Sequence, residues 1–94
     1  MVVGICTLEL DIPASQSLKD KRRIVNSVVA RVRQSFNVSI AQVDSLDAWQ
    51  HATIGIVCVS SDGKYAHGLL EKVIDNIERS RLDAVVADYS IEMW

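Results

Sequence analysis

The apolar residues of this chain follow two different periods, and the order in which the periods occur limits the fold to very few topologies. Residues 2–12 alternate between apolar and polar side chains, which is the pattern of a half-buried strand. Residues 37–44 repeat this alternation, and residues 51–61 form the most apolar stretch, which predicts a central strand. A fourth strand is predicted over residues 83–94, and one of its faces is expected to carry Val85, Ala87, Tyr89, Ile91 and Met93.

Two other segments carry apolar residues at the spacing of an α-helix. The first is expected from about Leu18 to Phe36, and it begins after Ser17, which is a favourable N-cap residue. Asp20, three positions after Ser17, resembles the second half of a capping box. The second helix is expected from about Lys64 to Ser80, and residues 61–62 offer a serine and an aspartate as its N-cap.

The predicted order is therefore strand, helix, strand, strand, helix, strand. Two right-handed split βαβ units satisfy this order with one four-stranded antiparallel sheet and both helices on one face. The sequence thus predicts the α+β class and a single ferredoxin-like βαββαβ sandwich over residues 1–94. The first and third strands form its central pair, and the other face of the sheet stays uncovered. This fold serves many unrelated functions, so function has to be argued from individual residues.

Composition excludes several classes of protein. With 10 Lys and Arg against 12 Asp and Glu, the net charge of -2 excludes a polycation that coats nucleic acid. The two cysteines, Cys6 and Cys58, allow at most one bridge, and they are expected to be buried, reduced thiols. No apolar run reaches the roughly 18 residues that span a bilayer, and no basic leader precedes the first strand. A cytoplasmic protein without membrane contact is expected.

Four segments carry a resemblance to a known family. They are VVGICTLELDIP at the start, SLKDKRRIV at Ser17–Val25, NVSIAQVDSLDAWQHATIGIVCVSSD at Asn37–Asp62 and VVADYSIEMW at Val85–Trp94. Together they resemble the YlxP-like proteins, small bacterial proteins that carry a domain of unknown function. The resemblance implies a ferredoxin-like fold in the bacterial cytoplasm. Genes of that family often lie among translation and ribosome-maturation genes, which implies RNA or ribosome association, and the family supplies no established catalytic residue.

The first predicted helix concentrates the positive charge of the chain. Residues 17–36 hold six basic residues and one acidic residue, a net charge of +5, whereas the remainder holds four basic and eleven acidic residues, a net charge of -7. Four of the cations occupy the first two turns, although a helix N-terminus already carries about half a positive charge. These cations repel one another and the helix N-terminus, and no nearby acidic cluster offsets the repulsion. A local rule that is broken in this way indicates a functional role. A helix N-terminus with Lys and Arg can bind an anion such as a phosphate.

The candidate phosphate contacts lie beside the buried stripe of this helix at about 100° per residue. Lys21 falls at the other margin, where its stem is expected to cover the core. The leading hypothesis is a non-enzymatic, RNA- or ribosome-associated accessory protein that contacts the phosphate backbone. Two alternatives are solvated charges partly paired with residues such as Asp11 and Asp20, and a small-molecule phosphate site. The proposed contacts are the cations Lys19, Arg22, Arg23 and Arg33, with Ser17 and Asn26 as neutral donors.

The uncovered face of the sheet is predicted to contact protein. RNA-recognition domains stack bases on aromatic residues of their two central strands, but residues 2–12 and 51–61 contain no Phe, Tyr or Trp. Glu9 and Asp11 on this face would also repel phosphate. The second hypothesis is therefore a protein-interaction or small-ligand regulatory domain that forms a homodimer by sheet packing or edge pairing, with a monomer as the alternative. The apolar centre of this face is expected to comprise Val3, Ile5, Val57 and Val59.

The remaining residues indicate neither catalysis nor a metal site. The chain has no P-loop, no dinucleotide-binding motif, no nucleophile elbow and no H-E-x-x-H, and residues 13–17 lack the glycine-rich anion loop of acylphosphatases. His51 and His67 lie on different predicted elements, without ligands at metal-binding spacing. No cofactor and no reading of DNA sequence are expected. Trp49, just before the third strand, is interpreted either as a lid over the core or as an anchor for a partner.

Overall fold

A computed structural model describes residues 1–80 and 83–94, and its elements follow the predicted order. Each strand and helix begins and ends within two residues of its predicted position, because hydrophobic period is a local property that the sequence states directly. The bounds are β1 (Val2–Asp11), α1 (Leu18–Ser35), β2 (Ser39–Asp44), β3 (His51–Ser60), α2 (Gly63–Arg79) and β4 (Val85–Met93).

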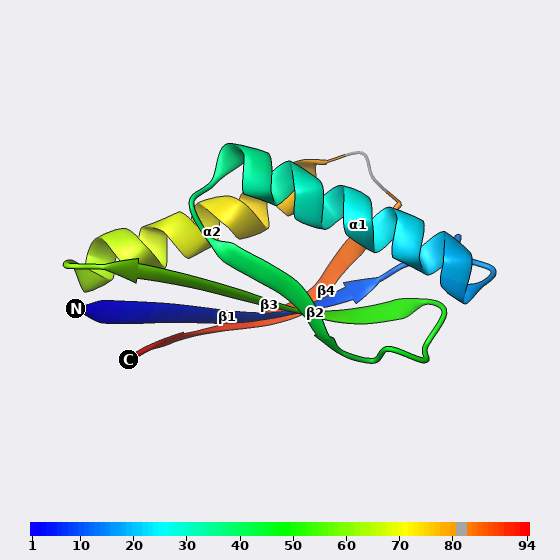
Figure 1. The fold of residues 1–94 in the computed structure, drawn as a ribbon, viewed down its shortest axis with the longest axis horizontal. Coiled ribbons are helices and arrows are strands. Elements are labelled where there is room, and N and C mark those ends of the chain that lie inside the picture. The colour runs from blue at the N-terminus through cyan, green and yellow to red at the C-terminus, as the bar shows by residue number, and fades with distance from the viewer. Residues whose placement is uncertain (81–82) are drawn as a thin grey trace.

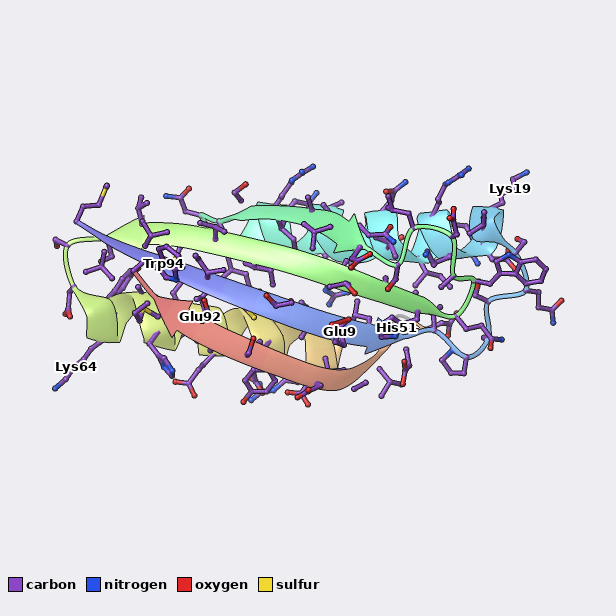
Figure 2. All side chains as sticks on the ribbon, turned by 90° about the horizontal axis from the view of Figure 1, so that it is seen from below. Glu9, Lys19, His51, Lys64, Glu92 and Trp94 are labelled. Carbon is purple, nitrogen blue, oxygen red and sulfur yellow. The ribbon has the colours of Figure 1, made fainter. Side chains whose placement is uncertain are left out.

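The four strands form one antiparallel sheet in the order β2-β3-β1-β4, so β1 and β3 are the central pair. Both helices cover the same face of the sheet (Figure 1), and the opposite face carries no helix (Figure 2). The predicted ferredoxin-like sandwich is thereby confirmed. The molecule is elongated, with extents of 42 × 22 × 18 Å. None of the helices in the described part of the chain is long and apolar enough to cross a membrane.

The hydrophobic core lies between the sheet and the two helices. On β1 it takes every second residue, and Cys6, Leu8 and Leu10 are fully buried, as the alternation predicts. Cys6 and Cys58 are both buried and unbridged, which confirms the prediction for the thiols. Burial raises the pKa of Cys6 to about 11, so this thiol stays protonated and unreactive at neutral pH.

The predicted face of β4 is wrong in one respect. The pairing of β1 with β4 shifts by one residue after the pair Glu9–Asp88, so that Leu10 lies opposite Val86. This β-bulge packs Val86 against the core and leaves Val85 exposed. Strict alternation, which the sequence analysis assumed, cannot reveal an inserted residue. Val85 and Ala87 therefore do not share a face with Tyr89, Ile91 and Met93.

Side-chain caps fix where each helix begins. The Ser17 hydroxyl accepts a hydrogen bond from the backbone N–H of Asp20 at 3.0 Å, and the Asp62 carboxylate accepts one from the N–H of Lys64 at 3.0 Å. The Asp20 carboxylate accepts from the N–H of Gln16 at 3.1 Å, whereas a capping box would use the N–H of the cap residue itself. The start of α1, and with it the orientation of its cations, is set by these short contacts.

Candidate functional site

The exposed side of α1 carries four of the residues that the sequence analysis proposed as phosphate contacts. Lys19, Arg22, Arg23 and Asn26 are all exposed, and we call them the basic face. The ion pairs among residues 1–80 and 83–94 lie on β1, β3 and α2, and none includes a cation of the basic face. Figure 2 shows Lys19 at one end of the long axis, with its side chain directed into solvent.

The two acidic residues named as partners for the basic face, Asp11 and Asp20, contact other groups. Asp11 lies 3.0 Å from His51 across the sheet, and Asp20 accepts from the backbone of Gln16. Neither carboxylate forms an ion pair with a cation of α1 among the described residues, so pairing with these two residues is wrong, whereas the alternative of solvated charges stays open.

Two further predicted contacts have roles inside the fold. Arg33 donates from Nη2 to the backbone carbonyl of Ile40 at 3.0 Å, which ties α1 to the edge strand β2. The hydroxyl of Ser17 caps α1. The structure thus separates Arg33 and Ser17, which serve packing and capping, from the four residues of the basic face.

Lys21 was expected at the margin of the buried stripe of α1. The structure instead buries this residue, and only 1% of it is exposed. Its ammonium group donates to the carbonyls of Ser45 at 2.6 Å, Ala48 at 2.5 Å and His51 at 3.1 Å, and a fourth carbonyl lies 3.4 Å away. The three short bonds match the three N–H donors of an ammonium group. Burial lowers the pKa of Lys21 below its usual 10.5, an effect that the charge of Asp47 opposes.

The segment held by Lys21 is the β2–β3 loop, residues 45–50. Ser45 adopts a φ of 61°, a left-handed conformation that is uncommon for a residue other than glycine. The side-chain amide of Gln50 donates to the carbonyls of Pro13 and Ser15, both at 3.1 Å. The loop is consequently fixed to α1 on one side and to the segment before α1 on the other.

The β2–β3 loop nevertheless presents its largest apolar side chains to solvent. Leu46 is 64% exposed and Trp49 is 56% exposed. A lid over the core would be buried, so that interpretation of Trp49 is wrong. The alternative, an anchor for a binding partner, fits an indole held outward on a fixed backbone.

The uncovered face of the sheet is apolar at one end. The predicted residues lie in two adjacent cross-strand pairs, Val3 opposite Val59 and Ile5 opposite Val57, and we call these four the apolar patch. Val59 is 66% exposed and Val57 is 36% exposed. Glu92, opposite Ile5 on β4, places an acidic residue at the margin of the apolar patch (Figure 2).

The other end of this face holds a charged cluster around His51. The imidazole lies 3.0 Å from Asp11 through Nδ1 and 2.9 Å from Glu9 through Nε2 (Figure 2). Glu9 also accepts a hydrogen bond from the hydroxyl of Thr53 at 2.5 Å, and Asp88 lies opposite Glu9 on β4. From the sequence, His51 was considered only as a metal ligand, so this cluster was missed.

Hydrogen bonds explain how this cluster titrates. The hydrogen bond to Asp11, and to a smaller extent the one to Glu9, raise the pKa of His51 above its usual 6.5. The hydrogen bond from Thr53, and to a smaller extent the one from His51, lower the pKa of Glu9 below its usual 4.5. Burial and the charge of Asp44 oppose this shift. A protonated His51 between two carboxylates is therefore the favoured state in mildly acidic solution.

Neither histidine belongs to a metal site in the described residues. The two carboxylates beside His51 contact different ring nitrogens, and His67 contacts Glu71 at 3.0 Å on the exposed side of α2. No group of three His, Cys, Asp or Glu residues within residues 1–80 and 83–94 is arranged to hold a metal ion.

The sequence contains a signal for Lys21 but none for the His51 cluster. Lys21 precedes Ile24 and Val25 by three and four positions, which places it on the same stripe as two buried residues. The contacts of His51 depend on its pairing with Asp11 across β1 and β3. These two residues are 40 positions apart along the chain, so no local pattern reveals their contact.

Comparison with known proteins gives a family whose function is unknown. A family model described as "Protein of unknown function (DUF503)" matches residues 3–91. The chain is 34% identical over 77 residues to the "Uncharacterized protein YlxP" of Bacillus subtilis (strain 168), a match that covers 82% of this chain and 84% of that protein.

Similar solved structures support the fold alone. LarC2, the C-terminal domain of a cyclometallase involved in the synthesis of the NPN cofactor of lactate racemase, matches with a TM-score of 0.51 and 14% identity. The match covers all of this chain and 55% of LarC2, so the chain spans about half of that domain. A de novo designed protein with a ferredoxin fold, LFR1 1, matches with a TM-score of 0.51 and 15% identity over all of this chain and 83% of the design.

Replacing Lys21 tests whether its ammonium group holds the β2–β3 loop. Lys21→Met keeps the length of the side chain but leaves the carbonyls of Ser45, Ala48 and His51 without their donor. The free energy of unfolding, measured by urea denaturation, is expected to fall by about 2 to 4 kcal/mol. The matched control Lys19→Met removes an exposed lysine of the same helix and is expected to change stability by less than about 0.5 kcal/mol. Equal effects of the two substitutions would contradict the role of Lys21.

The pH dependence of stability tests the His51 cluster. The raised pKa of His51 gives stability that is present below pH 6.5 and lost as the pH rises through the folded-state value. The lowered pKa of Glu9 gives stability that is present above pH 4.5 and lost as the pH falls through its folded-state value. His51→Gln is therefore expected to cost more stability in urea unfolding at about pH 5.5 than at about pH 8.5.

The same experiment has an internal control. Combining Glu9→Gln with Asp11→Asn removes both partners of His51, and in that background His51→Gln is expected to have a cost that no longer changes with pH. A cost in the natural chain that is independent of pH, or larger in alkaline solution, would show that the imidazolium is not held by these carboxylates.

Proposed function

Since the chain belongs to the DUF503 family of proteins of unknown function, its role has to be inferred from its own surface, and we propose that it is a non-enzymatic accessory protein associated with RNA or the ribosome. In this proposal the basic face of α1 contacts the phosphate backbone. The observation that carries it is that Lys19, Arg22 and Arg23 are exposed and belong to none of the ion pairs among the described residues.

The distribution of charge supports a polyanionic partner. Residues 17–36 carry a net charge of +5 in a chain whose net charge is -2. The cations lie on the helical side of the molecule, whereas Glu9, Asp88 and Glu92 lie on the uncovered side of the sheet. Mutual repulsion of neighbouring cations at a helix N-terminus is relieved when phosphates bind between them.

The form of the surface favours backbone contacts over reading of bases by the sheet. The central strands β1 and β3 contain no Phe, Tyr or Trp on which bases could stack, and His51 at the start of β3 is bonded to Asp11 and Glu9. A helix of 18 residues at about 1.5 Å per residue is long enough to lie across several phosphates. Contacts of this kind position a protein on nucleic acid without reading sequence.

A second proposal concerns the uncovered face of the sheet, which we propose forms a homodimer interface. The apolar patch places four β-branched side chains next to one another on the exposed side of the two central strands. A hollow of about 220 Å³, lined in part by Val57 and Val59, continues the patch toward β2. A contiguous apolar surface that no helix covers is the kind of surface on which proteins associate.

Charge reversal on α1 tests the RNA proposal. The double substitution Arg22→Glu and Arg23→Glu is expected to weaken binding of a fluorescent RNA at low salt by at least about tenfold, measured by fluorescence anisotropy, because it removes two phosphate contacts and adds repulsion. The slope of log Kd against log salt concentration is also expected to become shallower by about 1 to 2. Ribosome co-sedimentation is expected to fall in parallel.

The matched control reverses two exposed lysines of α2. Lys64→Glu with Lys72→Glu makes the same change in net charge, and Lys64 lies at the opposite end of the molecule from Lys19 (Figure 2). RNA affinity is expected to change little in this variant. If both double variants lose affinity equally, binding follows net charge and not the basic face, and the proposal fails.

Light scattering tests the dimer. The natural chain is expected to have twice its monomer mass of 10.4 kDa, and Val59→Asp at the centre of the apolar patch is expected to return it to the monomer mass because a carboxylate would be buried between subunits. Val85→Asp, an exposed valine of β4 outside the patch, serves as the control and is expected to remain dimeric. A natural chain that stays at monomer mass at every concentration would disprove the interface.

A further inference from the structure

The β2–β3 loop combines strong internal restraint with outward display of an aromatic ring. Resting on the proposed RNA-binding function, we propose that Trp49 stacks on an unpaired base of single-stranded RNA while Lys19 and Arg22 hold the neighbouring phosphates. The aromatic platform of this protein would thus lie beside α1 and not on the sheet.

Hydrogen bonds from two side chains restrain the six-residue β2–β3 loop. The buried ammonium group of Lys21 donates to three carbonyls in and beside the loop. The side-chain amide of Gln50 donates to two carbonyls in the segment before α1. Its backbone N–H groups take part as well, since Ala48 donates to the carbonyl of Ser45 at 3.2 Å. Burying a charge to hold a loop is costly. The burial of Lys21 fixes the backbone that carries Trp49. An aromatic ring held in place in this way loses little entropy when it binds.

Trp49 is also the aromatic residue best placed to act together with α1. The loop is bonded directly to the buried Lys21, so it lies against the first turns of α1, and the exposed Lys19 and Arg22 project from these same turns. The other aromatic residues lie elsewhere: Phe36 packs against the core after α1, Tyr65 is on α2, Tyr89 is on β4 and Trp94 follows β4.

The cations beside the loop distinguish a nucleic acid from a protein partner. Asp44 and Asp47 place negative charge before and within the loop. The exposed Lys19 and Arg22 in the adjoining turns of α1 supply the positive charge that a phosphate needs. Protein hot spots usually lie inside a broad desolvated surface, whereas the loop exposes one other large apolar side chain, Leu46. Stacking on a base needs only one aromatic face with a cation beside it.

The test compares two RNA probes with variants of the full chain. The probes are an unstructured single strand and a blunt duplex of the same length, both fluorescent, and Kd is measured by anisotropy. Trp49→Ala is expected to weaken binding of the single strand by about tenfold or more, because the stacked base is lost. Binding of the duplex and the salt dependence of both Kd values are expected to stay unchanged. Trp49→Phe, which keeps an aromatic face, is expected to retain most of the affinity.

A spectroscopic readout guards against misfolded variants. In a Trp94→Phe background, Trp49 is the only indole of the chain, and its fluorescence is expected to be quenched by the single strand and not by the duplex. Arg22→Glu with Arg23→Glu is expected to weaken both probes, which separates phosphate contact from stacking.

The outcomes distinguish the two proposals. If Trp49→Ala binds the single strand as tightly as the natural chain, or if the indole is not quenched, stacking is overturned while the role of α1 can still stand. If the natural chain binds neither probe, the RNA proposal itself fails. If Trp49→Ala instead lowers the oligomeric mass, Trp49 is a contact between protein subunits, and stacking is likewise overturned.

Discussion

The ammonium group of Lys21 is the contact on which the arrangement of the candidate site depends. It lies under α1 with three short bonds to backbone carbonyls around the β2–β3 loop. Without this cation the carbonyls would face a buried space with no donor, which is far more costly than leaving them in water. One buried charge thus fixes the loop that carries Trp49 to the helix that carries the exposed cations. Packing and the proposed binding surface are therefore linked through the same residue.

Charge is segregated between the two sides of this thin molecule. The helical side carries the basic face, while the uncovered side of the sheet carries Glu9, Asp11 and Asp88, with His51 bonded between the first two. A polyanion would be attracted to one side and repelled by the other, so an RNA strand has one favourable orientation. The apolar patch lies on the acidic side, and a dimer formed there would leave both basic faces accessible.

Much of the fold could be predicted because its determinants are local. Alternation and helical spacing located all six elements, and the helix starts were marked by Ser17 and by the pair Ser61 and Asp62, of which Asp62 is the cap. The bulge in β4 could not be predicted, since it depends on how β4 pairs with β1. The exposure of Lys19, Arg22 and Arg23 followed from helical angles. In contrast, the bonds of Lys21 and His51 join segments far apart along the chain, and those of His51 require the assembled sheet.

Mapping of the RNA contact by NMR tests the central claim most directly. In a titration of the isotope-labelled natural chain with single-stranded RNA at low salt, the largest amide shift changes are expected in the first three turns of α1 and in the β2–β3 loop. The amides of the apolar patch are expected to change little. Changes concentrated on β1 and β3 with α1 unaffected, or no changes anywhere, would contradict the account.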